Sequence, residues 1–147
     1  MTRALLLTLT LTMALPCAAA DVALDPALIA TLPTVKAGGT VHGKAIECEG
    51  VSLTSFLQAA KAMPTEPLRG AQLSRVVEVT ARDGYRVAFS MAELDPTLGN
   101  ARVFVVDACD GKPLDEHDGP LRLLVPGDAR PARGIRQLQS IVVADAP

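Results

Sequence analysis

Residues 110–126 read DGKPLDEHDGPLRLLVP and place a histidine, His117, between an Asp-Gly and a Gly-Pro turn signal. Both dipeptides are typical of tight turns, so we expect a shaped loop here. A histidine near neutral pH can hold or release a proton. Its neighbours Asp115, Glu116 and Asp118 leave two interpretations open: a solvated histidine paired with acids, or a residue of a binding pocket.

Arginines follow this loop, with Arg122 in the apolar stretch and Arg130, Arg133 and Arg136 beyond it. The planar guanidinium group of arginine binds phosphate or carboxylate through two parallel hydrogen bonds. The cluster therefore predicts either an anion site or a solvated basic face opposite the acidic loop. No phosphate-binding loop, Ser-His-Asp set or catalytic carboxylate pair is recognisable, and the two histidines have no partners at zinc-binding spacing.

The N-terminus carries the pattern of a secretory signal peptide. A basic residue precedes the apolar run ALLLTLTLTMAL, and a small Ala-Ala-Ala stretch fits a cleavage site. We therefore expect a signal peptide over residues 1–20 and a single mature domain over residues 21–147. The run is too short to span a bilayer and lacks a twin-arginine pair, so we expect Sec-type export and a periplasmic or secreted protein. A lipoprotein anchored through Cys17 is disfavoured by Pro16.

Cleavage would leave two cysteines, Cys48 and Cys109, in an exported chain. An even number of cysteines in that setting predicts a disulfide, which typically adds about 2–4 kcal/mol of stability. The composition argues against two classes of partner. There is no block of basic residues for nucleic acid or a membrane surface, and aromatic residues make up only 3% of the chain, too few for stacking on bases.

Helix signals occur at three places along the chain. Asp25 followed by Pro26 is a typical helix start. Ser52 precedes apolar residues that recur at helical spacing in LTSFLQAA, which predicts a second helix. Ser90 and Glu93 match a capping box, and the helix that they begin is expected to end near residues 99–100.

Strand-like runs outnumber these helices, which predicts an α+β fold with mixed or antiparallel sheets. The pair Gly38-Gly39 is expected to break the chain before the first strand. The Asp-Gly dipeptide in ARDGYRV, between two β-prone runs, predicts a hairpin. The expected strands cover residues 40–49, 76–80, 86–89, 102–107, 121–125 and 138–143.

The order of these elements resembles a known family. The segments GVSLTSFLQAA, VVEVTARDGYRVAFSMAELD and DGKPLDEHDGPLRLLVPGDARPARGIRQLQSI are similar to the molybdopterin-binding domain of the sulfite-oxidase family, and most of all to its small exported single-domain members. The similarity extends from about residue 24 to residue 143 and implies a sulfite-oxidase-like fold. It also implies that the loop and the basic segment behind it form a pterin-phosphate pocket.

The resemblance assigns four residues to that pocket. His117 matches the family's His-Gly pair, in which Asp118 is an insertion before the glycine. Arg122 matches the arginine of the following strand, and Arg133 and Arg136 fall on the basic positions of the closing segment. By resemblance, these side chains would hold molybdopterin.

The sequence departs from the family where the metal would bind. Catalytic members hold molybdenum through a cysteine thiolate in a Cys-x-Gly-Asn-x-Arg-like loop, whereas the corresponding stretch here reads HGKAIECEGVSL. Cys48 lies in it, but its acidic neighbours Glu47 and Glu49 disfavour the thiolate that this metal needs. The closing segment also lacks the family's tryptophan. We therefore expect no metal ligand and no bound molybdenum.

Two functions remain open. The first is a non-catalytic exported module, a pseudoenzyme that binds a small anionic ligand or a neighbouring periplasmic protein. The alternative is a periplasmic molybdopterin-dependent oxidoreductase or a subunit of one. The missing thiolate loop and the plain leader favour the first, since a protein exported by the Sec route crosses the membrane unfolded and without cofactor.

Overall fold

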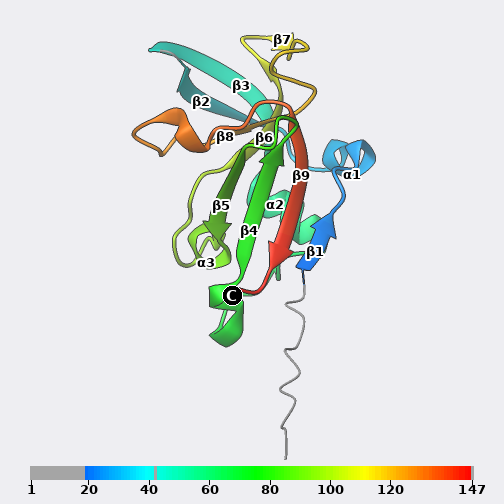
Figure 1. Ribbon diagram of the computed structural model, residues 1–147, viewed down its shortest axis with the longest axis vertical. Helices are drawn as coiled ribbons and strands as arrows, with labels where there is room; N and C mark the ends of the chain where they lie inside the picture. Colours follow the sequence, from blue (N-terminus) through cyan, green and yellow to red (C-terminus); the bar gives the residue numbers. More distant parts are fainter. Residues whose placement is uncertain (1–18, 42, 147) are drawn as a thin grey trace, which may run out of the picture.

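The computed structural model describes residues 19–41 and 43–146. Most of the predicted signal peptide and His42 lie outside these residues. The described chain forms two antiparallel sheets with a few short helices, which confirms the expected α+β class (Figure 1). Residues of both sheets and of α2, which lies behind β4 in Figure 1, pack into one hydrophobic core.

The strands of the first sheet are, in spatial order, β1 (Ala19–Val22), β9 (Leu138–Ala144), β4 (Val76–Ala81) and β5 (Arg86–Ser90). The strands of the second sheet are β2 (Val35–Val41), β3 (Lys44–Ser52), β6 (Phe104–Cys109) and β7 (Lys112–Pro113), with β8 (Arg122–Leu124) also paired to β6. Every pairing between these strands is antiparallel.

The helical elements are α1 (Pro26–Ala30), α2 (Leu53–Ala59), α3 (Met91–Leu94) and the 3-10 turns η1 (Gly70–Ser74) and η2 (Pro131–Arg133). The three predicted helix starts are confirmed, because the side chains of Asp25, Ser52 and Ser90 each accept a hydrogen bond from a backbone N–H group in the first turn. Within the described ranges, no helix is long and apolar enough to cross a bilayer.

The prediction that the third helix continues to residues 99–100 is wrong. α3 ends at Leu94, and Asp95 is extended, with φ −65° and ψ 125°. The cause is Pro96, since a proline disfavours helical backbone in the residue before it. The chain then folds back, and Gly99 packs so closely on α3 that an added Cβ would lie 2.5 Å from the carbonyl oxygen of Glu93.

The prediction that Gly38-Gly39 breaks the chain is also wrong, because both glycines lie inside β2. An added Cβ on Gly39 would lie 2.8 Å from Leu124 Cδ1, so the glycine permits close packing within the second sheet. The single strand expected over residues 40–49 is therefore the junction of β2 and β3, which pair from Val35 opposite Gly50 to Val41 opposite Lys44.

β1 and η1 have no counterpart in the prediction. β1 begins at Ala19, just before the expected cleavage point, and pairs with β9. Its residue Val22 is buried and belongs to the main core. The first sheet therefore uses residues on both sides of that point.

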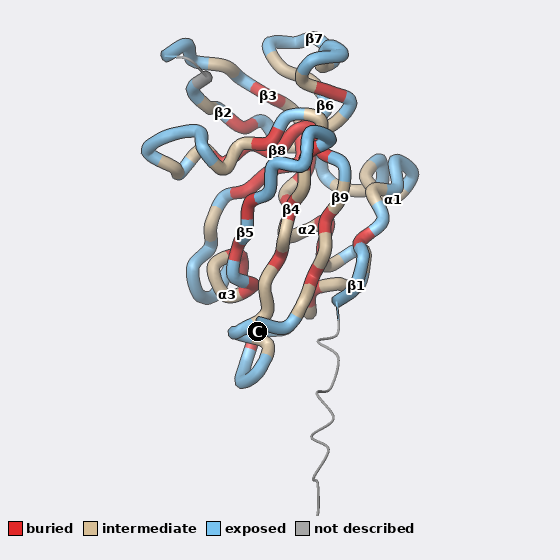
Figure 2. The backbone as a smooth tube through the Cα atoms, viewed as in Figure 1, coloured by how far each residue is buried: buried red, intermediate tan, exposed pale blue. Residues whose placement is uncertain are grey.

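The main core lies between the first sheet, α2 and one face of the second sheet (Figure 2). Side chains alternate between buried and more exposed positions along β4 and β5, which is the period of a strand with one face in the core. β6 is buried on both faces, because Val105 joins this core while Phe104 and Val106 join a second cluster. That second cluster consists of Ala37, Cys48, Phe104, Val106 and Leu124.

One buried carboxylate fixes the turn after α3. Asp95 is 2% exposed, its Oδ2 accepts from the backbone N–H of Leu68 at 2.8 Å, and its Oδ1 accepts from the N–H and hydroxyl of Thr97 at 2.6 and 2.7 Å. The bond from Leu68 is the largest cause that lowers the pKa of Asp95 below 3.8, followed by the two bonds from Thr97. All three donors need the ionised carboxylate, so the charged form ties two loops together.

We expect Asp95 to make stability depend on pH. Because its pKa is lower in the folded than in the unfolded protein, its stabilising effect is complete above the unfolded value of 3.8 and is lost as pH falls through the lower folded value. Urea unfolding at pH 7, 5, 4 and 3 should show a steeper acid loss in the wild type than in Asp95→Asn. The variant should also be less stable at pH 7, because its amide cannot accept all three bonds. Parallel acid profiles would contradict this assignment.

Candidate functional site

The loop after β7 is held by its own backbone and by one aspartate. Asp115 Oδ1 accepts from the backbone N–H groups of His117 and Asp118 at 3.0 and 2.9 Å, and the Asp115 carbonyl accepts from Gly119 N–H at 2.7 Å. An added Cβ on Gly119 would lie 2.9 Å from Leu114 Cβ, so this position requires glycine. The shaped loop predicted from the two turn signals is present, and Asp115 organises it.

Three of the four residues that the resemblance assigned to a pocket lie close together around Asp118. Arg122 Nη1 donates to Asp118 Oδ2 at 2.7 Å, and Arg136 Nε lies 3.9 Å from Asp118 Oδ1. Arg136 Nη1 lies 2.7 Å from His117 Nε2. The exposed His117 is thus paired mainly with an arginine. Asp118 balances part of the positive charge of this cluster.

Arg133, the fourth assigned residue, is used elsewhere. Its Nε and Nη2 donate to the two carboxylate oxygens of Asp128 at 2.9 and 2.6 Å, and its Nη1 donates to Glu93 Oε1 at 2.8 Å. Its guanidinium carbon lies 4.7 Å from the ring centroid of Phe89. The hydrogen bond from Arg133 lowers the pKa of Asp128, and the bonds to Asp128 and Glu93 raise the pKa of Arg133. Arg133 is therefore an anchor that ties the segment after β8 to α3 and β5.

Tyr85 fixes the same segment from a second side. Its hydroxyl donates to the carbonyl oxygen of Ala132 at 2.8 Å, across from the predicted hairpin turn between β4 and β5. Together with Arg133, it holds residues 128–134 in one position although they lie on the surface. A rigid wall of this kind is a pre-organised surface for a ligand.

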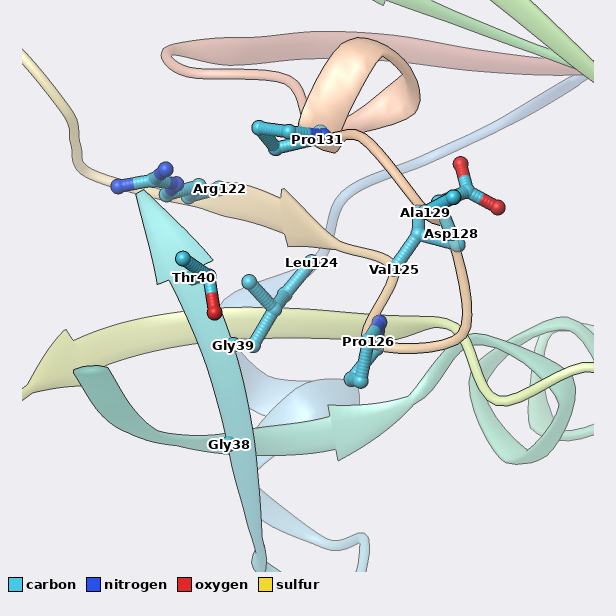
Figure 3. Close-up of a pocket in the computed structure, with 11 residues that line it drawn as sticks. Gly38, Gly39, Thr40, Arg122, Leu124, Val125, Pro126, Asp128, Ala129 and Pro131 are labelled. Carbon is cyan, nitrogen blue, oxygen red and sulfur yellow. The ribbon is translucent and has the colours of Figure 1, made fainter. Parts of the chain in front are cut away.

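A cavity of about 400 Å³ lies between β2 and this wall (Figure 3). Its lining comes from three stretches: the end of β2, β8 with the residues that follow it, and the η2 region. The residues are Gly38, Gly39, Thr40, Arg122, Leu124, Val125, Pro126, Asp128, Ala129, Pro131 and Gly134. Of the four assigned residues, only Arg122 lines it. The three β2 residues were not predicted as part of a site, although the Gly-Gly pair was the available signal.

Arg122 is a buried cation with an open donor. Its side chain is only 9% exposed, and Asp118 takes its Nη1. Its Nε is buried and has no hydrogen-bond partner among the described residues. A buried donor without an acceptor costs about 1–3 kcal/mol, so such a group normally meets an oxygen atom of water or of a ligand. The cavity is thus lined by a largely buried guanidinium group, one of whose donors has no acceptor among the described residues, beside an apolar floor.

The structure joins Cys48 and Cys109, the pair considered from the sequence, in a disulfide of 1.98 Å between β3 and β6. Cys48 is completely buried in the second cluster, beside Leu124 of the cavity floor. Its sulfur is therefore bonded to sulfur and is not a free thiolate. Within residues 19–41 and 43–146, no group of histidine, cysteine and acidic side chains is placed to hold a metal ion.

No family model matches the sequence, and no curated protein matches it closely. The fold and the site define an α+β protein of two antiparallel sheets, with a small cavity beside β2 and β8 of the second sheet that Arg122 lines.

Proposed function

We propose that the protein is an exported, non-catalytic binding module that receives a small oxyanion-bearing ligand at Arg122. The observation that carries the proposal is the buried Arg122 guanidinium, whose Nε has no partner among the described residues and which lines the cavity beside β2. A carboxylate or phosphate oxygen would supply the missing acceptor, and a charge-assisted bond of this kind is stronger than a neutral one.

The charges around the cavity favour an anion of low charge. Asp128 also lines the cavity, and both of its oxygens accept from Arg133, which also donates to Glu93, so the negative charge of Asp128 is only partly balanced. Asp118 balances part of the Arg122 charge from the other side. With one partly neutralised arginine, a single carboxylate or a singly bonded phosphate is better matched than a polyanion.

The sulfite-oxidase-like scaffold is part of this proposal as the origin of the pocket, but the residues present do not fit a molybdenum-pterin cofactor. The metal requires a soft thiolate, whereas Cys48 is buried in a disulfide. The pterin phosphate requires free arginines, whereas Arg133 donates to Asp128 and Glu93. These contacts favour the binding module over the alternative function, a molybdopterin-dependent oxidoreductase or a subunit of one.

The proposal includes a periplasmic or secreted location. A disulfide between Cys48 and Cys109 is typical of an oxidising compartment and agrees with the signal-like N-terminus. Cleavage after Ala20 would still leave Asp21 and Val22 paired with Val142 and Ile141 of β9.

The ligand site is tested by titrating the protein with acetate and with inorganic phosphate and following amide shifts by NMR. We expect saturable shifts at Gly38, Thr40 and Val125, and we expect Arg122→Gln to weaken binding by about tenfold or more. The matched control is Arg130→Gln, which removes the same charge from an exposed position that does not line the cavity. Its affinity should stay within about twofold of the wild type.

A second variant distinguishes a loss of anion binding from a folding defect. The double change Asp118→Asn with Arg122→Gln removes both members of the Arg122–Asp118 pair, and Arg136, which also lies near Asp118, is half exposed to solvent. It should keep the fold, as judged by its amide spectrum, and lose anion binding. Wild-type affinity in either Arg122 variant would refute the proposed site.

A further inference from the structure

We propose that the ligand at this site is the free C-terminus of an extended polypeptide from a partner protein. The peptide would add to β2 as a further strand and place its terminal carboxylate on Arg122. This inference rests on the proposed function, since it names the kind of oxyanion that Arg122 receives.

β2 offers an open strand edge. It is the outermost strand of its sheet and pairs with β3 along its whole length, from Val35 to Val41, while no other described strand pairs with its outer side. Alternate residues of such an edge strand direct their N–H and C=O groups away from the sheet, where they can pair with another chain. Proteins often protect an edge with a lysine, but Lys36 of β2 is held toward β3 by Glu47 and Glu49, at 3.1 and 3.5 Å.

The cavity lies along this edge. Three consecutive residues of β2, Gly38 to Thr40, form one of its sides. Gly38 carries no side chain, and an added Cβ would meet only the Ile46 carbonyl oxygen, at 4.0 Å, so this stretch of β2 is not crowded. Figure 3 shows that β2 runs past the apolar wall toward Arg122, so a strand laid along β2 would end at the guanidinium group.

The wall across the cavity from β2 determines which C-terminal side chain of the peptide fits. Leu124, Val125 and Pro126 present apolar surface to the cavity, and Ala129 and Pro131 continue that surface. This combination of backbone pairing, an apolar side-chain pocket and a cation for the carboxylate is a recurring mode of peptide recognition. It predicts a C-terminal residue that is apolar, such as valine or leucine.

Charge favours a terminal carboxylate over other occupants. A carboxylate has one negative charge and two coplanar oxygens, which suits a single guanidinium group already paired on one side with Asp118. The described residues at the end of β9 lie beside β1, at the opposite end of the molecule from β2 (Figure 1). A partner protein is therefore the occupant to which the geometry points.

The test uses two fluorescent hexapeptides of alternating threonine and valine, one ending in a free carboxylate on valine and the other in a valine amide. Fluorescence anisotropy should show that the acid binds at least about tenfold more tightly than the amide, and that Arg122→Gln abolishes this preference. Hydrogen exchange should show new protection of the β2 amides when the acid peptide is bound. Arg130→Gln should behave as the wild type.

A blocking variant tests the strand edge independently of Arg122. Gly38→Leu has space for its Cβ, so it should fold, and it adds a bulky side chain to a β2 residue that lines the cavity. We expect it to prevent peptide binding. Equal affinity of the acid and amide peptides, or binding without protection of β2, would overturn this inference.

The outcomes separate the two proposals. If acetate and phosphate bind through Arg122 but the acid peptide binds no more tightly than the amide peptide, the anion site is supported and the peptide proposal is wrong. If neither the small anions nor the peptide depend on Arg122, both proposals fail. Self-association of the peptide-free protein that hides the β2 amides would identify a second copy as the occupant and would also overturn the inference.

Discussion

Gly50→Ala is expected to lower the free energy of unfolding by about 3 kcal/mol or more, or to prevent folding. Gly50 lies in β3 where the pairing with β6 shifts register. An added Cβ would overlap the carbonyl group of Val105 and lie 2.5 Å from Val106 Cα. Both obstacles are backbone atoms of a strand that is buried on both faces, so neither can move aside without separating β3 from β6.

The matched control for Gly50 is Gly38→Ala, a second glycine in the neighbouring strand. Its added Cβ would meet only the Ile46 carbonyl oxygen, at 4.0 Å. Alanine at an unstrained position also restricts the unfolded chain, so the variant should lie within about 0.5–1 kcal/mol of the wild type. Urea unfolding of the three proteins measures both effects. Similar losses in the two variants would show that the close approach at Gly50 is not what limits stability.

Loss of the Cys48–Cys109 bridge is expected to destabilise the protein by about 2–4 kcal/mol. The cysteines are separated by 61 positions, and closing a loop of that length restricts the unfolded chain by up to about 4 kcal/mol in the entropic description. The bridge also joins β3 to β6 within the second cluster, which has few other members. Its loss should therefore loosen the second sheet first.

The measurement compares urea midpoints with and without reductant for the wild type and for the double variant Cys48→Ala with Cys109→Ala. Reductant should lower the midpoint of the wild type and leave that of the double variant unchanged. A wild type whose thiols are shown to be reduced by mass spectrometry, but whose midpoint stays the same, would contradict the expected contribution.

Local signals in the sequence were sufficient for the elements whose causes are local. Ser90 and Glu93 are three residues apart and form their capping box without help from the rest of the chain. The Asp-Gly turn likewise fixes the hairpin of β4 and β5, whose register runs from Val76 opposite Ser90 to Thr80 opposite Arg86. Such features depend on neighbours that the sequence displays directly.

Features that depend on distant partners were not predictable in this way. Gly-Gly is a common chain break, but Gly38-Gly39 serves close packing against Leu124, which lies in β8. The arginine spacing left an anion site and a solvated basic face open, and the partners of Arg133 decide its role, although Glu93 is 40 positions away in sequence. Arg122 lines a cavity because β8, the strand that carries it, lies close to β2, and this contact between distant segments has no local signal.

The pairing of β1 with β9 has a practical consequence for binding experiments. Ala19 lies opposite Ala144, so the start of β1 and the end of β9 are neighbours in the first sheet. Both lie at the opposite end of the molecule from β2 (Figure 1). An affinity tag or a surface linker attached beyond either strand would hold the molecule with its arginine cavity facing the solvent. Immobilisation through one end and through the other should consequently yield the same peptide affinity.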